Sequence, residues 1–314
     1  MYKVVYAFFY LLSLLPFRLL YCLSDLMYVI LYMLLRYRRK LVRKNLSFSF
    51  PEKSDKERRT IEHKFYHWFC DYFVEAIKLL SISEKEIRKR FDIVNADEVV
   101  ECFQEGQNAA GMLGHYCNWE WLSCFSLFLR KGDVVGLIYH PLRNKYFNKL
   151  FLALRSHVEG GVPIPKNDIL RYAINYKNKG ISTIFGYIYD QGPKYKNTHL
   201  WLNFLNQETP VFTGAERVIR KLDNAVFYLD MTRPKRGYYK CTFKLIARHP
   251  KELPEHELTR RFYAMLEETI RRAPEHYLWS HNRWKRTKEE FDRRYVIENG
   301  RVVPRHKKKE DGDA

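Results

Sequence analysis

The sequence lacks several short motifs that identify common enzyme classes. It contains no GxSxG nucleophile elbow and no glycine-rich phosphate loop of the GxxxxGK[ST] or GxGxxG kind. Its six cysteines include no CxxC pair and follow no regular spacing. These absences disfavour a serine nucleophile on an elbow, a nucleotide-binding loop of either kind, a disulfide framework and a zinc knuckle, and they suit a reducing compartment.

Negative charge is also scarce. The 314 residues include 55 Lys and Arg against 36 Asp and Glu, which leaves a net charge of +19. Because 46% of the residues are hydrophobic, the chain can bury enough surface to fold, and its length suits one large domain with or without an appendage. The positive excess requires a polyanionic partner, either nucleic acid or an anionic membrane surface.

The first long segment decides between these partners. Residues 4–35 are almost entirely apolar, with Arg18 and Asp25 as the only charges and Pro16 as an interruption. Each half is short for a helix that crosses a hydrocarbon core of roughly 30 Å. We therefore expect a tilted or kinked membrane anchor, or a helical hairpin that enters one leaflet. A cleaved signal peptide is disfavoured because no small-x-small cleavage site follows.

A basic flank follows the apolar segment directly. Such residues mark the cytoplasmic side of an anchor and attract anionic headgroups. A nucleic-acid-binding arm rarely follows thirty apolar residues, so we predict an anionic membrane and no nucleic acid as the partner. The basic flank consists of Arg36, Arg38, Arg39, Lys40, Arg43 and Lys44.

The remainder of the chain predicts an α/β fold with a mixed sheet covered by helices. Apolar residues at helical spacing predict an amphipathic helix over 60–80, on which His63 and His67 are a structural pair or, with a third ligand, a metal pair. Strand and helix patterns then alternate. We expect a membrane anchor with its basic flank over 1–44, one catalytic domain over 45–290 and a charged tail over 291–314. The expected strands are 109–113, 133–139, 181–189, 200–205, 225–231 and 238–246, and the expected helices are 97–105, 118–130, 145–157, 168–178, 213–222 and 255–272.

One histidine is placed where chemistry is expected. His115 follows an apolar run that ends in Gly114, at the point where a helix should begin, and Glu120 lies five residues further on. In a regular helix the two side chains would point about 140° apart, but a His115 in the preceding loop could be reached by Glu120. A carboxylate on one imidazole nitrogen makes the other nitrogen a general base. Cys117 is an alternative nucleophile, although a buried structural cysteine is the commoner outcome.

Two further segments carry polar groups beside apolar ones. Residues 139–155 include His140, Arg143, Asn144 and Arg155, and residues 189–193 end a predicted strand in a turn. Strand ends are a usual place for functional groups in α/β sheets, whereas a solvated helix face and an ordinary turn are the alternative interpretation.

The spacing from His115 to Glu120 resembles the HX4D/E motif of the lysophospholipid acyltransferase superfamily. The chain as a whole resembles the late acyltransferases of lipid A biosynthesis over roughly residues 5–290. Further segments match that family in the same order: NLSFSFPEKSDKERRTIEHKFY after the basic flank, Tyr139-x-Pro141-x-x-Asn144 with Arg155, Asp190-Gln191-Gly192-Pro193, Thr213-Gly214, and Pro274 to Lys285. His140, Lys145 and the segment 200–205 depart from the family pattern, at positions where the resemblance places the bound substrate.

The resemblance implies roles for individual residues. His115 would be the general base and Glu120 its partner, with Arg155 binding an oxyanion or a phosphate. Asp190 would be a second required carboxylate. The other residues implied in substrate binding are Arg143, Asn144, Gln191, His281 and Arg283.

The resemblance also implies a reaction. The chain would be a glycerolipid acyltransferase-like O-acyltransferase on the cytoplasmic face of a bacterial inner membrane, using no metal and no cofactor. It would transfer an acyl chain from an acyl carrier protein or acyl-CoA to a phosphorylated glycolipid. A lysophospholipid or an N-acyl amino-acid lipid is the alternative acceptor. A non-catalytic membrane or nucleic-acid binding protein is the alternative of another class.

Overall fold

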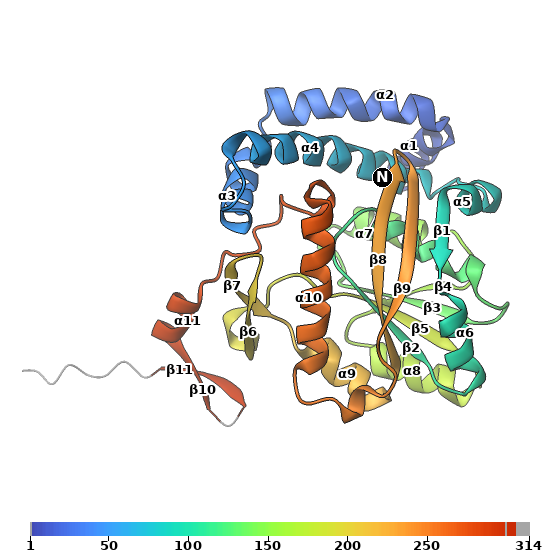
Figure 1. The fold of residues 1–314 in the computed structure, drawn as a ribbon. Helices are drawn as coiled ribbons and strands as arrows, with labels where there is room; N and C mark the ends of the chain where they lie inside the picture. The colour runs from blue at the N-terminus through green and yellow to red at the C-terminus, as the bar shows by residue number, and fades with distance from the viewer. Residues whose placement is uncertain (1, 299, 306–314) are drawn as a thin grey trace, which may run out of the picture.

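The computed structural model describes residues 2–298 and 300–305. Its first part is helical: α1 (Tyr2–Leu14), α2 (Phe17–Tyr28), a π-helical continuation (Val29–Leu34), α3 (Arg39–Ser49) and α4 (Asp55–Lys78). Pro16 separates α1 from α2, and a capping box between Ser54 and Glu57 begins α4. Figure 1 shows α2 lying along α4 at one end of the molecule.

The centre is a seven-stranded mixed sheet in the order β1-β9-β8-β2-β5-β3-β4. Only the β8–β9 pair is antiparallel, so β1 and β9 run against the other five strands. The sheet confirms the predicted fold class. Its strands are β1 (Phe91–Val94), β2 (Ala109–Leu113), β3 (Val134–Tyr139), β4 (Gly161–Pro165), β5 (Thr183–Ile188), β8 (Ala225–Lys235) and β9 (Tyr238–Ala247).

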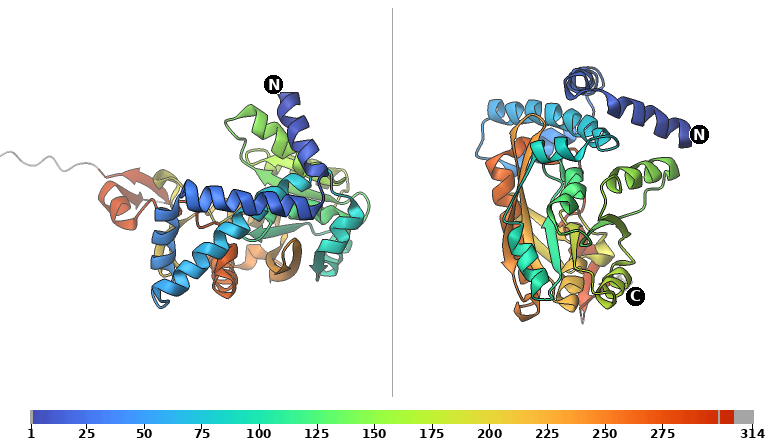
Figure 2. Two further views of the ribbon diagram at one scale, coloured as in Figure 1. Left: turned by 90° about the horizontal axis from the view of Figure 1, so that it is seen from above. Right: turned by 90° about the vertical axis from the view of Figure 1, so that its right-hand side faces the viewer.

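Helices cover both faces of this sheet. Helix α10 packs against β8 and β9, whereas α7 and α8 lie on the other side, next to β4 (Figures 1 and 2). The 3-10 helix η2 packs between β3 and α7. The covering helices are α5 (Glu84–Arg90), α6 (Asp97–Gln104), η2 (Trp119–Phe128), α7 (Lys145–Arg155), α8 (Ile169–Asn178), α9 (Gly214–Leu222) and α10 (Glu257–Arg272).

Smaller elements complete the chain, and the sequence patterns predicted few of them. An antiparallel pair is formed by β6 (Leu200–Phe204) and β7 (Gln207–Val211), and a second by β10 (Tyr295–Glu298) and β11 (Arg301–Pro304). Helix α11 spans Lys288–Arg294, so ordered structure continues through the expected boundary at residue 290. Of the charged end of the chain, residues 306–314 lie outside the described residues. The remaining 3-10 turns are η3 (Tyr195–Asn197), η4 (Pro250–Glu252) and η5 (Pro274–His276).

The N-terminal segment is packed on the rest of the protein, although the sequence patterns suggested a separate anchor. Arg38 donates from Nη1 to the carbonyl of Ser280 at 2.8 Å, and Asn45 donates to the carbonyl of Trp279 at the same distance. Residues Phe17–Leu34 form a continuous helical stretch that is long and apolar enough to cross a membrane, yet 22% of it is buried in the protein.

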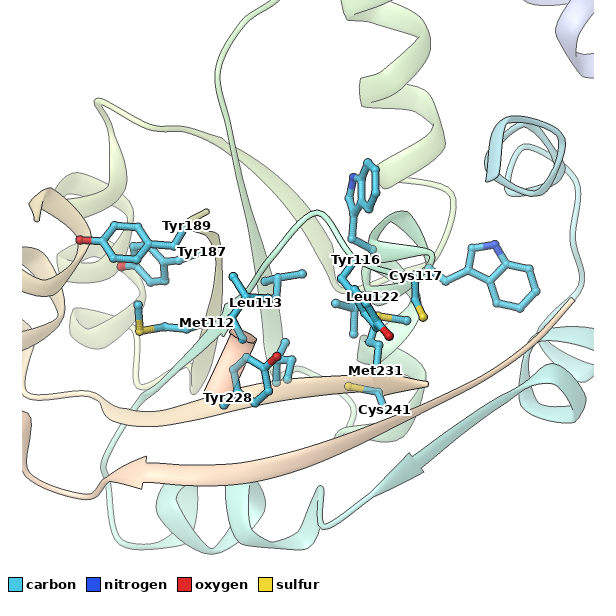
Figure 3. Close-up of a cluster of buried hydrophobic side chains, with 14 of the residues drawn as sticks. Met112, Leu113, Tyr116, Cys117, Leu122, Tyr187, Tyr189, Tyr228, Met231 and Cys241 are labelled. Carbon is cyan, nitrogen blue, oxygen red and sulfur yellow. The ribbon is translucent and has the colours of Figure 1, made fainter. Parts of the chain in front are cut away.

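The loop after β2 is anchored in the core. Figure 3 shows Tyr116 and Cys117 of this loop in one buried cluster with Met231 of β8 and Cys241 of β9. Close packing of these side chains fixes the loop on the sheet, and with it the preceding residue, His115.

Candidate active site

Two neighbouring parallel strands bring His115 and Asp190 together. Strands β2 and β5 pair in a register that sets Leu113 opposite Ile188, and each polar residue lies two positions beyond its strand's last paired residue. The His115 backbone N–H donates to Asp190 Oδ2 at 3.0 Å, and its Nδ1 lies 2.6 Å from Asp190 Oδ1. One carboxylate therefore holds both the backbone and the ring of His115.

Gly114 allows this close arrangement. A Cβ atom at position 114 would lie 2.7 Å from Cδ1 of Leu266 on α10 and 3.6 Å from the Asp190 carboxyl carbon. No real side chain tolerates the first of these distances without movement of its neighbour. The glycine thus lets α10 approach the loop that carries His115.

The contacts of His115 define which ring nitrogen carries the proton of the neutral imidazole. Burial favours the neutral form of Asp190, but the charge interaction and hydrogen bonds with His115 hold the pKa of that carboxyl below its ordinary value. An ionised carboxylate only accepts hydrogen bonds, so the proton of the ring sits on Nδ1. The Nε2 atom then carries a lone pair, and the side-chain amide nitrogen of Gln191 lies 3.2 Å from it as a donor. The side chain of His115 is 16% exposed.

Glu120 does not contact His115, and this corrects the predicted pair. Its carboxylate binds Arg155 through two hydrogen bonds, from Nε at 2.8 Å and from Nη2 at 2.7 Å. The reason is local geometry, because η2 begins directly after Asn118 and carries Glu120 in its first turn towards the end of α7. The Glu120 side chain is 3% exposed and that of Arg155 is 18% exposed. A cation buried to this extent requires a counterion, which Glu120 provides.

An aromatic side chain joins the two polar pairs. The Trp119 ring meets the His115 ring edge-on, with 5.0 Å between centroids, and stacks on Tyr72 at 4.3 Å. The Tyr72 hydroxyl lies 3.5 Å from Glu120 Oε1 as a donor. Trp119 therefore lies between the His115–Asp190 pair and the Glu120–Arg155 pair.

A buried glutamate, which the sequence patterns did not indicate, binds the segment that follows His115. Glu75 of α4 is fully buried, and its carboxylate accepts from Asn118 Nδ2 at 2.9 Å and from the hydroxyl of Tyr239. Its backbone carbonyl accepts from Trp121 Nε1 at 3.3 Å. Burial raises the pKa of the Glu75 carboxyl, and the hydrogen bonds from Tyr239 and Asn118 act in the opposite direction. A buried polar group without such partners would destabilise the fold. Its place in an apolar helical pattern was the only signal in the sequence.

An apolar cavity begins beside the Glu120–Arg155 pair. It lies between η2 and the strands β2, β3, β5 and β8 and has a volume of about 50 Å³. Gly111 and Gly186 line part of the cavity, and neither strand position has a side chain that would fill it. Its apolar lining residues are Leu113, Trp119, Leu122, Phe125, Val135, Leu137, Ile138, Ile184, Ile188 and Leu229.

The remaining expected site residues occupy different surroundings. Arg143 is exposed, and Asn144 caps α7 by accepting from the N–H groups of Tyr146 and Phe147. His281 is half-buried near the His115–Asp190 pair, and burial together with the charge of Arg283 lowers its pKa to about 4. Arg283 is 2% exposed and donates from Nη2 to the carbonyl of Pro210 at 2.8 Å. The structure thus places Gln191 and His281 near His115 and gives Asn144 a capping contact.

The alternative chemistries have little support from the contacts. Cys117 is fully buried, and burial raises the pKa of its thiol well above the ordinary value, so it is a poor nucleophile. His63 lies 3.0 Å from the hydroxyls of both Tyr28 and Tyr32, and His67 stacks on Tyr28. Within the described residues, no group of three or more His, Cys, Asp and Glu side chains could hold a metal ion.

Comparison with known proteins gives matches over most of the chain. The family profile described as bacterial lipid A biosynthesis acyltransferase matches residues 2–286. A lipid A biosynthesis palmitoleoyltransferase of Escherichia coli strain K12 is 24% identical over 259 residues, which cover 80% of each chain. A lipid A biosynthesis acyltransferase of Shigella flexneri matches with the same identity and coverage.

Proposed function

Because the chain belongs to the bacterial lipid A biosynthesis acyltransferase family, we propose that it transfers a fatty acyl chain from a thioester to a hydroxyl group of a lipid A precursor. The observation that carries the proposal is the His115–Asp190 pair, whose His115 ring meets Trp119 in the lining of an apolar cavity. The pair provides a base for the hydroxyl, and the apolar lining of the cavity suits an acyl chain. The family match supports the reaction class, and the residue roles are our own assignment.

His115 is the general base in this proposal. Its Nε2 lone pair accepts the proton of the acceptor hydroxyl, which takes the place of the Gln191 amide in the resting contact. The hydroxyl oxygen attacks the thioester carbonyl and forms a tetrahedral oxyanion. The carbon–sulfur bond then breaks, and the leaving thiolate takes the proton from the imidazolium, which yields an ester and a free thiol. Asp190 keeps the proton on Nδ1 and stabilises the transient imidazolium.

Arg155 is the cation closest to the cavity in this arrangement. Two of its nitrogen groups bind Glu120, while Nη1 has no hydrogen-bond partner in the described part of the chain. We assign this group to the thioester carbonyl oxygen, where negative charge develops. Preorganised donors of this kind contribute about 3–4 kcal/mol to transition-state stabilisation. Glu120 then serves as the residue that positions Arg155, which replaces its predicted role beside His115.

The donor and the acceptor follow from charge and apolarity. The net charge of +19 favours an acidic carrier protein or acyl-CoA as the donor and a phosphorylated glycolipid as the acceptor, at an anionic membrane. We propose the cytoplasmic face of the inner membrane as the location, because the basic flank follows the apolar helices there. A lysophospholipid acceptor would use the same His115–Asp190 pair.

The test is acyl transfer by the purified full-length chain. A lipid A precursor, a lysophospholipid and an N-acyl amino-acid lipid are each offered with acyl carrier protein thioesters and with acyl-CoA, and products are identified by mass spectrometry. We expect an ester on the lipid A precursor, and a turnover about 10²–10⁴-fold lower in His115→Ala with unchanged thermal stability. Transfer only to the other two lipids would overturn the acceptor assignment. Near-normal turnover of His115→Ala would overturn the base assignment.

A further inference from the structure

Helix α2 and its π-helical continuation lie antiparallel along α4. As the residue numbers in α2 rise, the partners in α4 fall: Tyr21 donates to Glu75, Ser24 donates to Asp71, and Tyr28 stacks on His67. Tyr32 continues the series with a contact to His63. The two helices therefore touch over the whole central part of the apolar stretch, as Figure 1 also shows.

These contacts are polar, and several are buried. Ser24 is 1% exposed and Asp71 is 2% exposed, with 2.6 Å between their oxygens. Asp25 forms an ion pair with Arg236, which also binds Asp71. A helix that crosses a bilayer must leave the domain that it is packed on, and here Asp71 and Glu75 would each lose a buried donor. The stretch is therefore fixed against the protein along its length.

The opposite face of the same stretch is apolar and uncovered. Leu19, Leu26 and Met33 lie seven residues apart and are 51%, 56% and 54% exposed. Helix α1 adds Val4, Phe8, Leu11 and Leu14, each more than half exposed. A continuous apolar face of this size on a helix that is polar underneath is typical of helices that lie in the plane of a membrane interface.

The structure divides the basic flank into two sets. Arg39 and Arg43 form ion pairs with the buried Glu62, and Arg38 binds the carbonyl of Ser280. The other set, Arg36, Lys40 and Lys44, is exposed and forms no ion pair within the described residues. Lys40 and Lys44 are one helical turn apart on α3, so positive charge remains available on the helix that follows the apolar stretch in the chain.

We propose that α1 and the stretch Phe17–Leu34 lie in one leaflet of an anionic bilayer and do not cross it, with Lys40 and Lys44 on the headgroups. The N-terminus then stays on the same side as the catalytic domain. The inference rests on the proposal that the chain acts at a membrane, but it is independent of the roles of His115 and Asp190.

This orientation also connects the membrane to the site. Helix α1 lies over α7 (Figure 2), and the rings of Phe9 and Phe147 approach to 6.4 Å between centroids. Along α7, Phe147 is followed one turn later by Phe151 and two turns later by Arg155, which binds Glu120. This face of α7 leads from the lipid-facing helix to the mouth of the apolar cavity, which gives an acyl chain an apolar approach.

Depth measurements distinguish the two orientations. The variants Leu19→Cys, Leu26→Cys and Met33→Cys are each made with Cys22→Ser, so that each has one exposed cysteine, because Cys22 is exposed and the other cysteines are buried. Each is labelled with bimane in vesicles that contain phosphatidylglycerol, with lipids brominated at shallow or deep acyl positions as quenchers. We expect all three probes to be quenched more strongly by the shallow bromines. If the probe at position 26 were quenched more strongly by the deep bromines, while those at positions 19 and 33 were quenched more strongly by the shallow ones, the helix would cross the bilayer and the proposal would be overturned.

Sidedness provides a second, independent readout. Lys3→Cys and the reference Lys221→Cys on α9 are treated with an impermeant maleimide in spheroplasts and in inverted inner-membrane vesicles. We expect both to be labelled from the same side, and labelling from opposite sides would show that the helix crosses the membrane.

The headgroup contact is tested in the same vesicles. Lys40→Gln with Lys44→Gln should reduce partition into anionic vesicles by roughly fivefold per charge removed, while neutral vesicles show no change. The matched control Lys221→Gln should have a much smaller effect, and an equal loss in both would contradict the assigned headgroup contact. Acyl transfer to a detergent-dispersed acceptor should remain, so failure here is separable from failure of the catalytic proposal.

Discussion

Two pairs of side chains lie on either side of Trp119, and each pairs a carboxylate with a basic group. They differ in whether the basic group can give up its proton. His115 with Asp190 contains an imidazole ring that can accept and release a proton, and the carboxylate binds the backbone as well as the ring. Glu120 and Arg155 form a bidentate ion pair, and the guanidinium group stays protonated. The comparison indicates that only the first pair can perform acid–base chemistry, whereas the second can hold a positive charge in a fixed place.

The largest effect that separates the pairs is expected from Asp190→Asn. The His115 backbone N–H requires an acceptor, so the amide oxygen takes that contact and the amide nitrogen faces Nδ1. The ring proton then moves to Nε2, where the base needs its lone pair. We expect turnover to fall by about 10³–10⁴-fold with little change in fold, measured by single-turnover acyl transfer and circular dichroism. A loss of less than tenfold would contradict the role of Asp190.

Glu120→Gln should have a smaller effect on turnover and a larger one on stability. The substitution leaves Arg155 without its counterion, and removal of one partner of a buried pair destabilises a protein by about 3–5 kcal/mol. Because Arg155 is 18% exposed and water can partly solvate it, we expect the unfolding free energy to fall by about 3 kcal/mol. We expect turnover to fall by about 10–100-fold. If Glu120→Gln instead matched Asp190→Asn in turnover while remaining fully stable, Glu120 would be the better candidate for the dyad.

Arg155→Lys sharpens the comparison further. Lysine keeps the charge but cannot bind Glu120 through two parallel N–H groups while a third faces the cavity. We expect turnover to fall by roughly tenfold with a nearly unchanged KM for the acceptor, because the lost contact is made to the developing oxyanion. A change in KM alone would instead assign Arg155 to acceptor binding.

The smallest effect is expected from Cys117→Ser. The thiol is fully buried and takes no part in either pair, so turnover should stay within about threefold of the parent chain. A hydroxyl in that apolar position should lower the unfolding free energy by about 1–2 kcal/mol, measurable by denaturant titration. An abolished reaction in a folded variant would restore the thiol mechanism.

The sequence predicted most strands and helices because their patterns are local. The runs at 109–113 and 181–189 were both expected as strands, and both are present. Their pairing in parallel register was not predictable, because it depends on contacts between residues 75 positions apart. The choice of Glu120 as the partner of His115 followed chain proximity, whereas the true neighbour follows strand adjacency at the carboxyl edge of the sheet.

The basic flank illustrates the same limit. All six cations were expected to face headgroups, but two of them neutralise Glu62, whose burial on α4 could not be seen from its position in the sequence. The short strand β1 and the hairpin β10–β11 were also missed, because strands of four residues carry too little periodicity.

The most direct test of the central claim is the tautomer of His115, read from side-chain ¹⁵N chemical shifts of ¹⁵N-histidine-labelled protein. At neutral pH we predict a proton on Nδ1 in the parent chain and in Glu120→Gln, and a proton on Nε2 in Asp190→Asn. A His115→Ala sample assigns the resonance. If the tautomer changed in Glu120→Gln and stayed the same in Asp190→Asn, Glu120 would orient the base, and the account given by the structure would be contradicted.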